Sequence, residues 1–389
     1  MADLSALNND SQDEHDDMYD YSYYNEYLEN GNHLHNYGVC EKGHVKAFAR
    51  VFLPVLYTSV FVLGMVGNGL LAGILIRYIK LKRMVDIYLL NLAVSDLLFV
   101  VTLPFWAVYA HSEWIFGSTT CKAVTLIYTM NLYSSIFFIT CISLDRYLEF
   151  VWSFHTINLR KLPVSCAICA AVWTVSALAS APDVIFTELQ EFRDHKLCLH
   201  NFGGEHMSWW KIFMKFELNI VGFFIPFLAM LFFYSRISCV ITRAKLHRGT
   251  KSLKLAIALV VFFFVLWFPY NLVVFLHSLQ DLHVISHCTT SQHLDFAIQV
   301  TESLAFVHAC LNPILYAFVN KKFQHHLMSM LKMICRRGRE YSLEHEGHSS
   351  TQNTVTDLSG GGNALVCVSV LPILPIDPEI GLVQQNSGL

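Results

Sequence analysis

The sequence predicts an all-α membrane protein built as a bundle of seven transmembrane helices. Hydrophobic residues make up 54% of its 389 residues and charged residues only 15%, whereas about a quarter of an average soluble domain is charged. The apolar residues are grouped into long stretches with almost no Asp, Glu, Lys or Arg. A helix is the open-chain structure that satisfies its own backbone hydrogen bonds inside lipid. The seven stretches are residues 51–76, 87–112, 123–144, 162–182, 218–235, 255–280 and 296–320.

Each stretch is about long enough to cross a bilayer, because about 20 helical residues span the ~30 Å hydrocarbon core. One such stretch alone is equally typical of a buried helix in a soluble protein, but seven in succession favour the membrane. The second stretch holds a single acid, Asp96, and the seventh holds Glu302. We expect kinks or helix ends at five prolines. These are Pro104, Pro182, Pro226, Pro269 and Pro313.

The segments that connect the spans alternate in charge. The first 50 residues hold ten acidic and three basic residues, and the second, fourth and sixth connections are neutral or acidic. The first, third and fifth connections are basic. The positive-inside rule therefore predicts a multi-pass plasma-membrane protein with an extracellular N-terminus and a cytosolic C-terminus. The sequence has no domain-sized basic stretch, which argues against a nucleic-acid partner.

These features divide the chain into four expected parts. Residues 1–46 form an extracellular, acidic, Tyr-rich tail, and residues 47–320 form the transmembrane domain in the lipid bilayer. Residues 321–337 are expected to form an amphipathic helix on the membrane surface. Residues 338–389 are expected to form a disordered cytosolic tail.

The N-terminal tail combines carboxylates with tyrosines and contains no Lys or Arg in residues 1–39. Acidic flanks make the tyrosines candidates for sulfation, and an anionic, aromatic arm suits a basic protein ligand. A disordered, solubilising tail is the alternative. The sequon at Asn9 is a candidate glycosylation site. The tyrosines that we expect to contact a ligand are Tyr19, Tyr21, Tyr23 and Tyr24.

Four of the 11 cysteines fall on the predicted extracellular side, where oxidising conditions favour disulfides. They are Cys40, Cys121, Cys198 and Cys288. Three pairings are formally open. We expect one bridge between Cys121 and Cys198, which would join the third span to the loop after the fourth. The other would then join Cys40 to Cys288, at the mouth of the bundle.

Ionisable residues at membrane depth are costly and are usually functional. Asp96 lies near the middle of its span, where polar side chains of other spans can converge on it. Oxygen-rich surroundings suit a hydrated sodium ion, and a purely structural hydrogen-bond network is the alternative. We expect no other cofactor or metal. The candidate network residues are Asn131, Ser135, His308 and Asn312.

Glu302 lies nearer the outer end of the last span, where it can face a cavity lined by aromatic side chains. An anion in an aromatic cavity is suited to a cationic group of a ligand. The candidate lining residues are Tyr57, Trp106, Tyr109, Tyr128 and Tyr270.

Other classes of membrane protein fit this sequence less well. A light-driven, retinal-binding protein needs a lysine in its last span, and here the first lysine follows the span at Lys321. A transporter more often has internal repeats and several intramembrane charges. No phosphate-binding loop, nucleophile elbow or paired-histidine metal motif in the sequence indicates an enzyme.

Short motifs occur in a characteristic order along the chain. They include Gly67-Asn68, Asp145-Arg146-Tyr147, Trp267-Phe268-Pro269-Tyr270 and Asn312-Pro313-Ile314-Leu315-Tyr316. Others are Thr102-Leu103-Pro104, Trp114-Ile115-Phe116-Gly117 and Gln299-Val300-Thr301-Glu302. Each motif is weak alone. In this order, the four motifs that begin with Gly67-Asn68 make residues 40–337 resemble the rhodopsin-like G-protein-coupled receptors. The three motifs that begin with Thr102-Leu103-Pro104 resemble those of the chemokine receptors.

This resemblance implies a rhodopsin-like bundle whose ligand is a small, basic CC chemokine. The tail would hold the chemokine's body, and the chemokine's N-terminus would enter the cavity toward Glu302. The resemblance also implies a cytosolic switch in which one helix swings outward to admit a heterotrimeric G protein or an arrestin. The residues matched to this switch are Asp145, Arg146, Tyr147, Trp267, Pro269, Asn312, Pro313 and Tyr316.

One position departs from the family pattern. After Asp-Arg-Tyr, signalling chemokine receptors usually continue with Leu-Ala-Ile-Val, whereas this chain has Leu148-Glu149-Phe150-Val151. Glu149 adds negative charge where a transducer would dock. Together with Phe202-Gly203-Gly204 and residues 263–272, this departure resembles the scavenging chemokine receptors. The resemblance implies a receptor that takes up CC chemokines through arrestin and recycling endosomes with little G-protein signalling. Because Arg146 is intact, a conventional receptor that drives chemotaxis and calcium signalling is the alternative.

The C-terminal tail contains a cluster of serines and threonines. Phosphorylation of this cluster would add negative charge that the cationic surface of an arrestin can bind. An ordinary Ser/Thr-rich disordered tail is the alternative. The candidate sites are Ser349, Ser350, Thr351, Thr354 and Thr356.

Overall fold

The structure is a computed structural model. Along the chain it divides into two units between Val319 and Asn320. All the helices and strands named below belong to the first unit. In the second unit, residues 323–330 are helical, and an amphipathic helix over residues 321–337 stays a prediction. The structure describes residues 43–81, 83–152, 162–192, 195–202, 208–244, 250–282, 288–319, 323–330 and 332–333.

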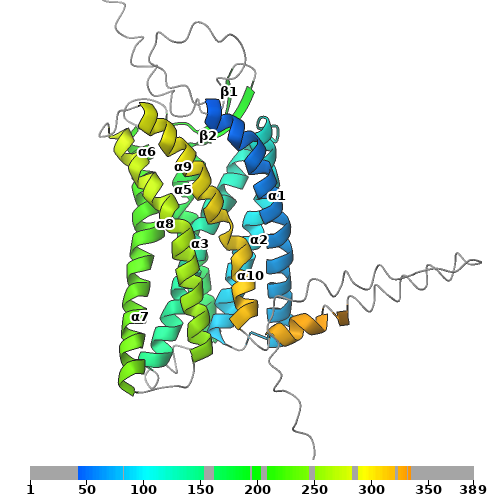
Figure 1. Cartoon of the computed structure of the whole chain (residues 1–389), viewed down its shortest axis with the longest axis vertical. Helices are drawn as coiled ribbons and strands as arrows, with labels where there is room; N and C mark the ends of the chain where they lie inside the picture. Colours follow the sequence, from blue (N-terminus) through cyan, green and yellow to red (C-terminus); the bar gives the residue numbers. More distant parts are fainter. Residues whose placement is uncertain are drawn as a thin grey trace, which may run out of the picture. The chain divides into compact units, whose positions relative to one another are not determined.

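The described residues contain seven helical spans that are long and apolar enough to cross a membrane (Figure 1). The prediction of a seven-helix bundle is therefore confirmed. Three spans are single helices, α2 (Met84–His111), α3 (Ser118–Val151) and α8 (Thr250–Asp281). Each of the other four spans combines consecutive helices. The first combines α1 (Gly43–Ile74) and η3 (Leu75–Ile79), and the fourth combines α4 (Leu162–Ala179) and α5 (Ala181–Phe186). The fifth combines α6 (Ser208–Asn219), η5 (Ile220–Phe224) and α7 (Ile225–Ala244), and the last combines α9 (Cys288–Phe306) and α10 (His308–Val319).

A two-stranded antiparallel hairpin lies at one end of the bundle, which we call the hairpin end (Figure 1). It consists of β1 (Thr187–Phe192) and β2 (His195–His200). In its register, Thr187 pairs with His200 and Phe192 pairs with His195. The sequence predicted only a loop here, so the hairpin is an addition to the predicted fold.

Two of the five prolines lie at helix boundaries, Pro182 in the first turn of α5 and Pro226 in the first turn of α7. Pro104 and Pro269 lie inside the continuous helices α2 and α8, and Pro313 lies inside α10. A helix tolerates proline in a membrane when other groups satisfy the backbone carbonyl that loses its donor. The last span instead changes helix at Val307, where backbone hydrogen bonds connect residues three apart.

Pro313 explains why Gly67 and Asn68 occur together in α1. Proline has no N–H, so the carbonyl of Ala309, four residues earlier, loses its helical donor. The Asn68 Nδ2 donates to that carbonyl at 2.7 Å. A Cβ on Gly67 would lie only 2.8 Å from the Pro313 Cγ. Gly67 therefore lets the two helices approach, and Asn68 satisfies the carbonyl that Pro313 leaves open.

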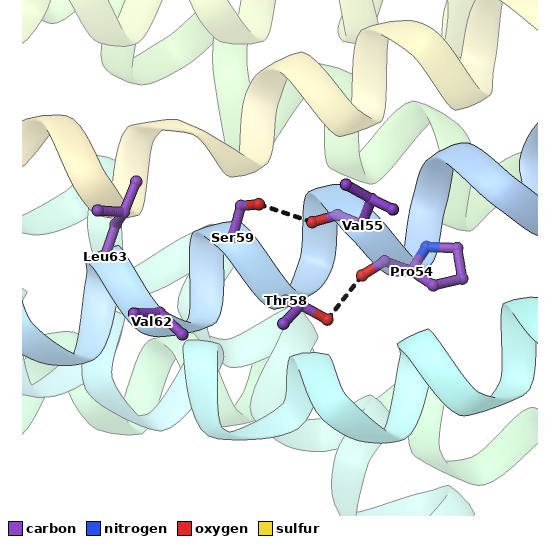
Figure 2. A pocket seen from close by; sticks show the side chains of 6 residues that line it. All are labelled: Pro54, Val55, Thr58, Ser59, Val62 and Leu63. Atoms are coloured by element: carbon purple, nitrogen blue, oxygen red, sulfur yellow. Dashed lines mark hydrogen bonds between the residues drawn. The ribbon is translucent and has the colours of Figure 1, made fainter.

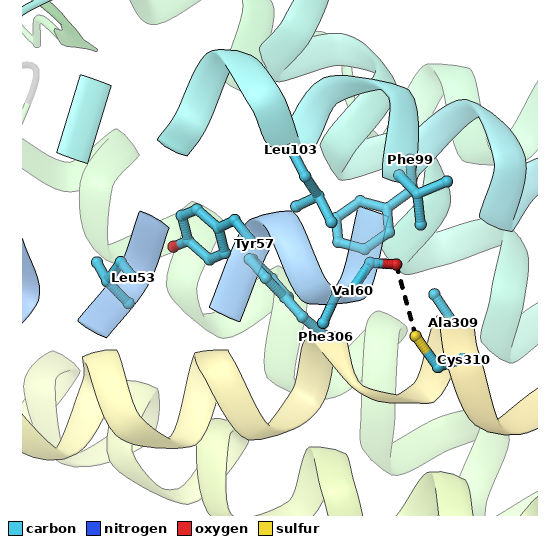
Figure 3. Packing of buried hydrophobic residues seen from close by; sticks show 9 residues of the cluster. Leu53, Tyr57, Val60, Phe99, Leu103, Phe306, Ala309 and Cys310 are labelled. Carbon is cyan, nitrogen blue, oxygen red and sulfur yellow. Dashed lines mark hydrogen bonds between the residues drawn. The ribbon is translucent and has the colours of Figure 1, made fainter. Parts of the chain in front are cut away.

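An apolar cluster packs the first, second and last spans together (Figure 3). Phe99 meets Phe306 edge to face, with ring centroids 5.0 Å apart, and Tyr57 lies 5.6 Å from the same Phe306 ring. The Cys310 thiol donates to the Val60 carbonyl at 3.6 Å. The cluster consists of Leu53, Tyr57, Val60, Phe99, Val100, Leu103, Phe306, Ala309 and Cys310.

Another face of α1 points outward and forms a shallow groove (Figure 2). Val55 is 65% exposed and Leu63 is 63% exposed. The hydroxyls of Thr58 and Ser59 donate to carbonyls of their own helix, each at 2.7 Å. The groove thus offers apolar surface and few free polar groups, as expected for a face in contact with lipid.

We expect Gly67→Ala to destabilise the bundle, because the new methyl group would push against Pro313. Overpacking of this kind typically lowers the free energy of unfolding by about 1–3 kcal/mol. Thermal unfolding of the purified protein in detergent measures the effect. Gly69→Ala is the matched control, because a Cβ there would meet nothing within 4 Å. Equal unfolding temperatures for the two variants would contradict the proposed close contact.

Candidate functional site

A cavity of about 490 Å³ opens between the helices at the hairpin end. Its walls come from α1, α2, α3, α5, α6, α8 and α9, and the hairpin contributes Thr187, Cys198, Leu199 and His200. The structure brings together all six residues that the sequence analysis placed in one cavity. They are Tyr57, Trp106, Tyr109, Tyr128, Tyr270 and Glu302.

Glu302 is an acidic residue of this cavity, and aromatic side chains surround it. Its Oε1 accepts a hydrogen bond from the Tyr128 hydroxyl at 2.7 Å. The Tyr128 ring in turn lies 6.2 Å from the Trp106 ring and 5.7 Å from the Phe306 ring. A carboxylate that is hydrogen-bonded on one oxygen and enclosed by aromatic faces is suited to a cationic group.

The hairpin is fastened to the cavity by a disulfide and a hydrogen bond. Cys121, in the first turn of α3, is bonded to Cys198 of β2, with Cα atoms 5.8 Å apart. This confirms the first predicted bridge. The Tyr109 hydroxyl donates to the Cys198 carbonyl at 3.2 Å. The hairpin therefore forms a fixed part of the cavity wall.

Trp114 explains the motif Trp114-Ile115-Phe116-Gly117. It is fully buried beside the disulfide, and its backbone N–H donates to the Lys196 carbonyl of β2 at 2.8 Å. Its indole N–H donates to the Gly117 carbonyl at 2.9 Å. Gly117 has a φ of +83°, a left-handed conformation that favours glycine. The motif thus forms a turn that supports the hairpin from the side of α2.

Contacts between ionisable side chains, none of which the sequence predicted, join the helices around the cavity. The Nζ of Lys211 and of Lys215, both in α6, lie 3.2 and 2.5 Å from the Asp281 carboxylate at the end of α8. His277 of α8 lies 3.6 Å from Asp295 of α9. These residues belong to no motif, and their partners lie in other helices. The sequence could have indicated only Asp295, because it shares one helix face with Glu302.

A further pair connects α5 to the hairpin. The Nε2 of His200 in β2 lies 3.4 Å from the Asp183 carboxylate. Both residues line the cavity. Among the described residues, no group of three or more His, Cys, Asp or Glu side chains is arranged to hold a metal ion. Lys211 and Lys215 thus pair with Asp281, Asp183 and Asp295 each lie near a histidine, and Glu302 has an uncharged partner.

Asp96 lies deeper in the bundle and is fully buried. Its Oδ1 accepts hydrogen bonds from the Asn131 amide at 3.2 Å and the Ser135 hydroxyl at 3.5 Å. Its Oδ2 accepts a hydrogen bond from the Asn312 amide at 2.7 Å, and the His308 Nε2 lies 3.5 Å from Oδ1. All four predicted network residues thus surround the carboxylate, two from α3 and two from α10.

Arg146 lies at the end of the bundle opposite the hairpin, and two carboxylates bind it. One guanidinium nitrogen contacts Asp145, and another contacts Glu149 one turn further along α3. The Arg146 side chain is 4% exposed and that of Glu149 is 39% exposed. The charge of Arg146 is therefore balanced within its own helix, in part by the residue that departs from the family pattern.

Arg83, which precedes α2, adds a second positive charge to this region. Its guanidinium donates to both Asp86 carboxylate oxygens, at 3.2 and 2.9 Å, and its charge also interacts with Glu149 and Tyr316. Burial alone would lower the pKa of Arg83, but the hydrogen bonds and the attraction of Asp86 outweigh it and raise the pKa. The carboxylate of Glu149 is therefore within the influence of two permanent cations.

The other predicted switch residues lie in α3, α8 and α10. Trp267 is buried in α8, with its ring 5.3 Å from His308 and 5.8 Å from Tyr270. It therefore connects the cavity to the Asp96 network. Tyr147 stacks on Phe233 of α7 at 5.2 Å. The remaining members, Pro269, Asn312, Pro313 and Tyr316, lie in α8 and α10.

Several predicted sites lie outside the described residues. They include the second disulfide, because the structure does not describe Cys40 or the side chain of Cys288. The others are Asn9, Tyr19, Tyr21, Tyr23, Tyr24, Ser349, Ser350, Thr351, Thr354 and Thr356. These sites stay predictions.

Comparison with known proteins identifies the family. Residues 67–316 match the family described as 7 transmembrane receptor (rhodopsin family). The chain belongs to this family. The receptor is 45% identical to atypical chemokine receptor 2 of Mus musculus over 314 residues, which cover 80% of this chain and 83% of the relative.

Two human CC chemokine receptors are also similar to this receptor. It is 40% identical to C-C chemokine receptor type 4 of Homo sapiens over 325 residues, which cover 81% of this chain and 90% of the relative. It is 40% identical to C-C chemokine receptor type 1 of Homo sapiens over 293 residues, or 75% and 82% of the two chains. The protein is therefore a multi-pass plasma-membrane chemokine receptor of the CC type and not an enzyme. Its partners are chemokines and a transducer of the G-protein or arrestin class.

We expect Cys121→Ser to destabilise the receptor and to weaken chemokine binding, because the hairpin would lose its link to α3. Loss of a native disulfide typically costs about 2–5 kcal/mol. Thermal unfolding and the binding of a labelled chemokine measure the two effects. Cys166→Ser is the control, because Cys166 is an exposed free cysteine of α4. If both variants behaved like the wild type, the hairpin would not depend on this bridge.

Proposed function

We propose that this receptor is a scavenger, which binds CC chemokines at the cell surface and internalises them with little G-protein signalling. The observation that carries the proposal is the double contact of Arg146 with Asp145 and Glu149. The similarity to atypical chemokine receptor 2 supports the same subtype. The N-terminus is extracellular in this proposal, in agreement with the charge pattern of the connecting segments.

The physical reason lies in the two states of the bundle. A ligand shifts the bundle toward an open state only by its differential affinity for that state. An additional ion pair that holds Arg146 in the closed arrangement raises the free energy that the ligand must supply. Glu149 also places a carboxylate where the helix of a G protein would dock. Both effects weaken G-protein coupling and leave the ligand cavity unchanged.

The ligand is bound in two parts. The acidic, tyrosine-containing tail attracts the basic body of the chemokine. The chemokine's N-terminal ammonium group enters the cavity and lies next to Glu302 and the surrounding aromatic rings. Phosphorylation of the C-terminal tail would then recruit an arrestin, and the receptor would carry its cargo to recycling endosomes.

A conventional chemotactic receptor is the second candidate. Arg146 is intact and contacts Asp145, as a functional switch requires. The 40% identity to two conventionally named C-C chemokine receptors also favours it. Under this reading, Glu149 would be a tolerated substitution that leaves Arg146 free to exchange partners.

We expect cells that express the wild-type receptor to take up labelled CC chemokine without measurable G-protein activation. Glu149→Ala should raise ligand-dependent G-protein activation by about fivefold or more, as a change in coupling free energy of about 1 kcal/mol allows. A biosensor for G-protein dissociation and a fluorescence uptake assay measure the two outputs.

Two further variants separate charge from size at this position. Glu149→Gln keeps the size and removes the charge, so it should behave like the alanine variant. Glu149→Asp keeps the charge and should behave like the wild type. Strong G-protein activation by the wild-type receptor would instead support the conventional receptor.

We also propose that the Asp96 network binds a sodium ion. The oxygen atoms near Asp96 suit a hard cation, because they include its own carboxylate and the hydroxyls of Ser135 and Ser95, which the Asn131 amide nitrogen links to it. A bound sodium ion would stabilise the closed arrangement by joining α2 to α3.

We expect sodium chloride to raise the unfolding temperature of the receptor relative to choline chloride at equal ionic strength. The expected gain is about 1 kcal/mol when sodium is present at several times its dissociation constant. Asp96→Asn should abolish the difference. Thr102→Val removes another buried hydroxyl of α2 and should preserve it. A sodium effect that survives Asp96→Asn would place the ion elsewhere.

A further inference from the structure

Gln299 of α9 carries a buried acceptor that has no partner. Its side chain lines the cavity, the residue is only 8% exposed, and its Oε1 has no hydrogen bond within the part of the chain that the structure describes. Buried polar atoms are almost always hydrogen-bonded, and each exception calls for an explanation. A donor supplied by a bound ligand is one such explanation.

The neighbours of Gln299 on the same helix face are already engaged. Asp295 is four residues earlier and lies 3.6 Å from His277. Glu302 is three residues later and accepts a hydrogen bond from Tyr128. Residues three and four apart share one face of a helix. Within the described part of the chain, Glu302 on this face accepts a hydrogen bond from α3 and Asp295 lies near a histidine of α8, whereas the Gln299 Oε1 between them has no hydrogen bond.

The position of Gln299 along α9 indicates which ligand atoms it can meet. α9 begins at Cys288 near the hairpin end, so Gln299 lies one turn nearer the cavity mouth than Glu302. One turn corresponds to about 5 Å. An extended peptide advances about 3.3–3.6 Å per residue. With its ammonium group at Glu302, a ligand chain that leaves the cavity brings its second or third residue alongside Gln299.

The chemistry of Gln299 selects the kind of group. A neutral amide oxygen suits a neutral N–H donor, whereas Glu302 with its charge suits the ammonium group. The terminal torsion of a glutamine side chain has a broad energy minimum, so the oxygen can turn toward a ligand at little cost.

We propose that the Gln299 Oε1 accepts a hydrogen bond from a backbone N–H of the second or third residue of the chemokine. Gln299 is then a specificity-determining residue that sets the register of the ligand chain relative to Glu302. This inference rests on the proposed function, because it requires that a chemokine N-terminus enters the cavity.

Amide-to-ester substitution in a synthetic chemokine tests the contact, because it replaces one N–H with oxygen and changes little else. Esters are placed singly at residues two, three and five, and competition binding is measured on wild-type and Gln299→Leu receptors. We expect the ester at residue two or three to weaken binding to the wild type about tenfold, as the loss of one buried hydrogen bond predicts. The same ester should leave binding to Gln299→Leu unchanged. The ester at residue five should behave alike on both receptors.

Controls make the outcome decisive. Gln299→Glu keeps an acceptor at this position and should remain sensitive to the ester, which shows that a loss in Gln299→Leu is not a folding defect. Surface amount and binding of the native chemokine are measured for each variant. Equal losses on wild type and Gln299→Leu would overturn the inference while leaving the proposed function intact. Absence of chemokine binding by the wild type would overturn both.

Discussion

The fully buried carboxylate of Asp96 is the constraint on which the arrangement of the helices depends. An ionised group at membrane depth is costly unless other polar groups surround it. Asn131 and Ser135 of α3 and His308 and Asn312 of α10 meet this requirement. Apolar packing alone gives little direction to helices in lipid, because lipid tails are as apolar as the side chains. The polar contacts therefore define how α2, α3 and α10 face one another.

The same requirement acts on the backbone and extends the network to α1. The carbonyl that Pro313 leaves without a donor is satisfied by Asn68, and the short contact between Gly67 and Pro313 makes this possible. Between the cavity and this network lies Trp267, whose ring contacts His308 on one side and Tyr270 on the other. A ligand that moves Tyr270 thus acts on side chains that hold the helices together. Such a contact chain offers a physical route between the two ends of the bundle, and coupling along it is a hypothesis.

At the far end, the charge of Arg146 is balanced differently. Its carboxylate partners Asp145 and Glu149 both lie in α3, so the interaction adds no link between helices. It instead places two carboxylates of the same helix against one guanidinium. The cavity and the polar network are those expected of a chemokine receptor, and the restraint on Arg146 is local. In the scavenging proposal, a restraint of this kind weakens G-protein coupling without changing the ligand cavity.

Much of this organisation followed from the sequence, because it depends on local composition. Runs without charge predicted the seven spans, and positions relative to those spans predicted the Cys121–Cys198 bridge and the six aromatic and acidic cavity residues. The β1–β2 hairpin was missed, although polar and apolar residues partly alternate in it. The contacts of Lys211 and Lys215 with Asp281 were missed because helix rotation decides which charged residues meet. The contact between Glu149 and Arg146 was also missed, although the two residues are one helical turn apart.

The movement of α8 in response to ligand tests the central claim most directly. Spin labels near Val151 of α3 and Thr250 of α8, in receptor reconstituted in lipid nanodiscs, report the distance between the two helix ends by double electron–electron resonance. We expect a saturating chemokine to leave the distance distribution of the wild type nearly unchanged and to add a longer distance in a Glu149→Gln background. A ligand-induced longer distance of equal population in both proteins would contradict the claim that Glu149 restrains Arg146.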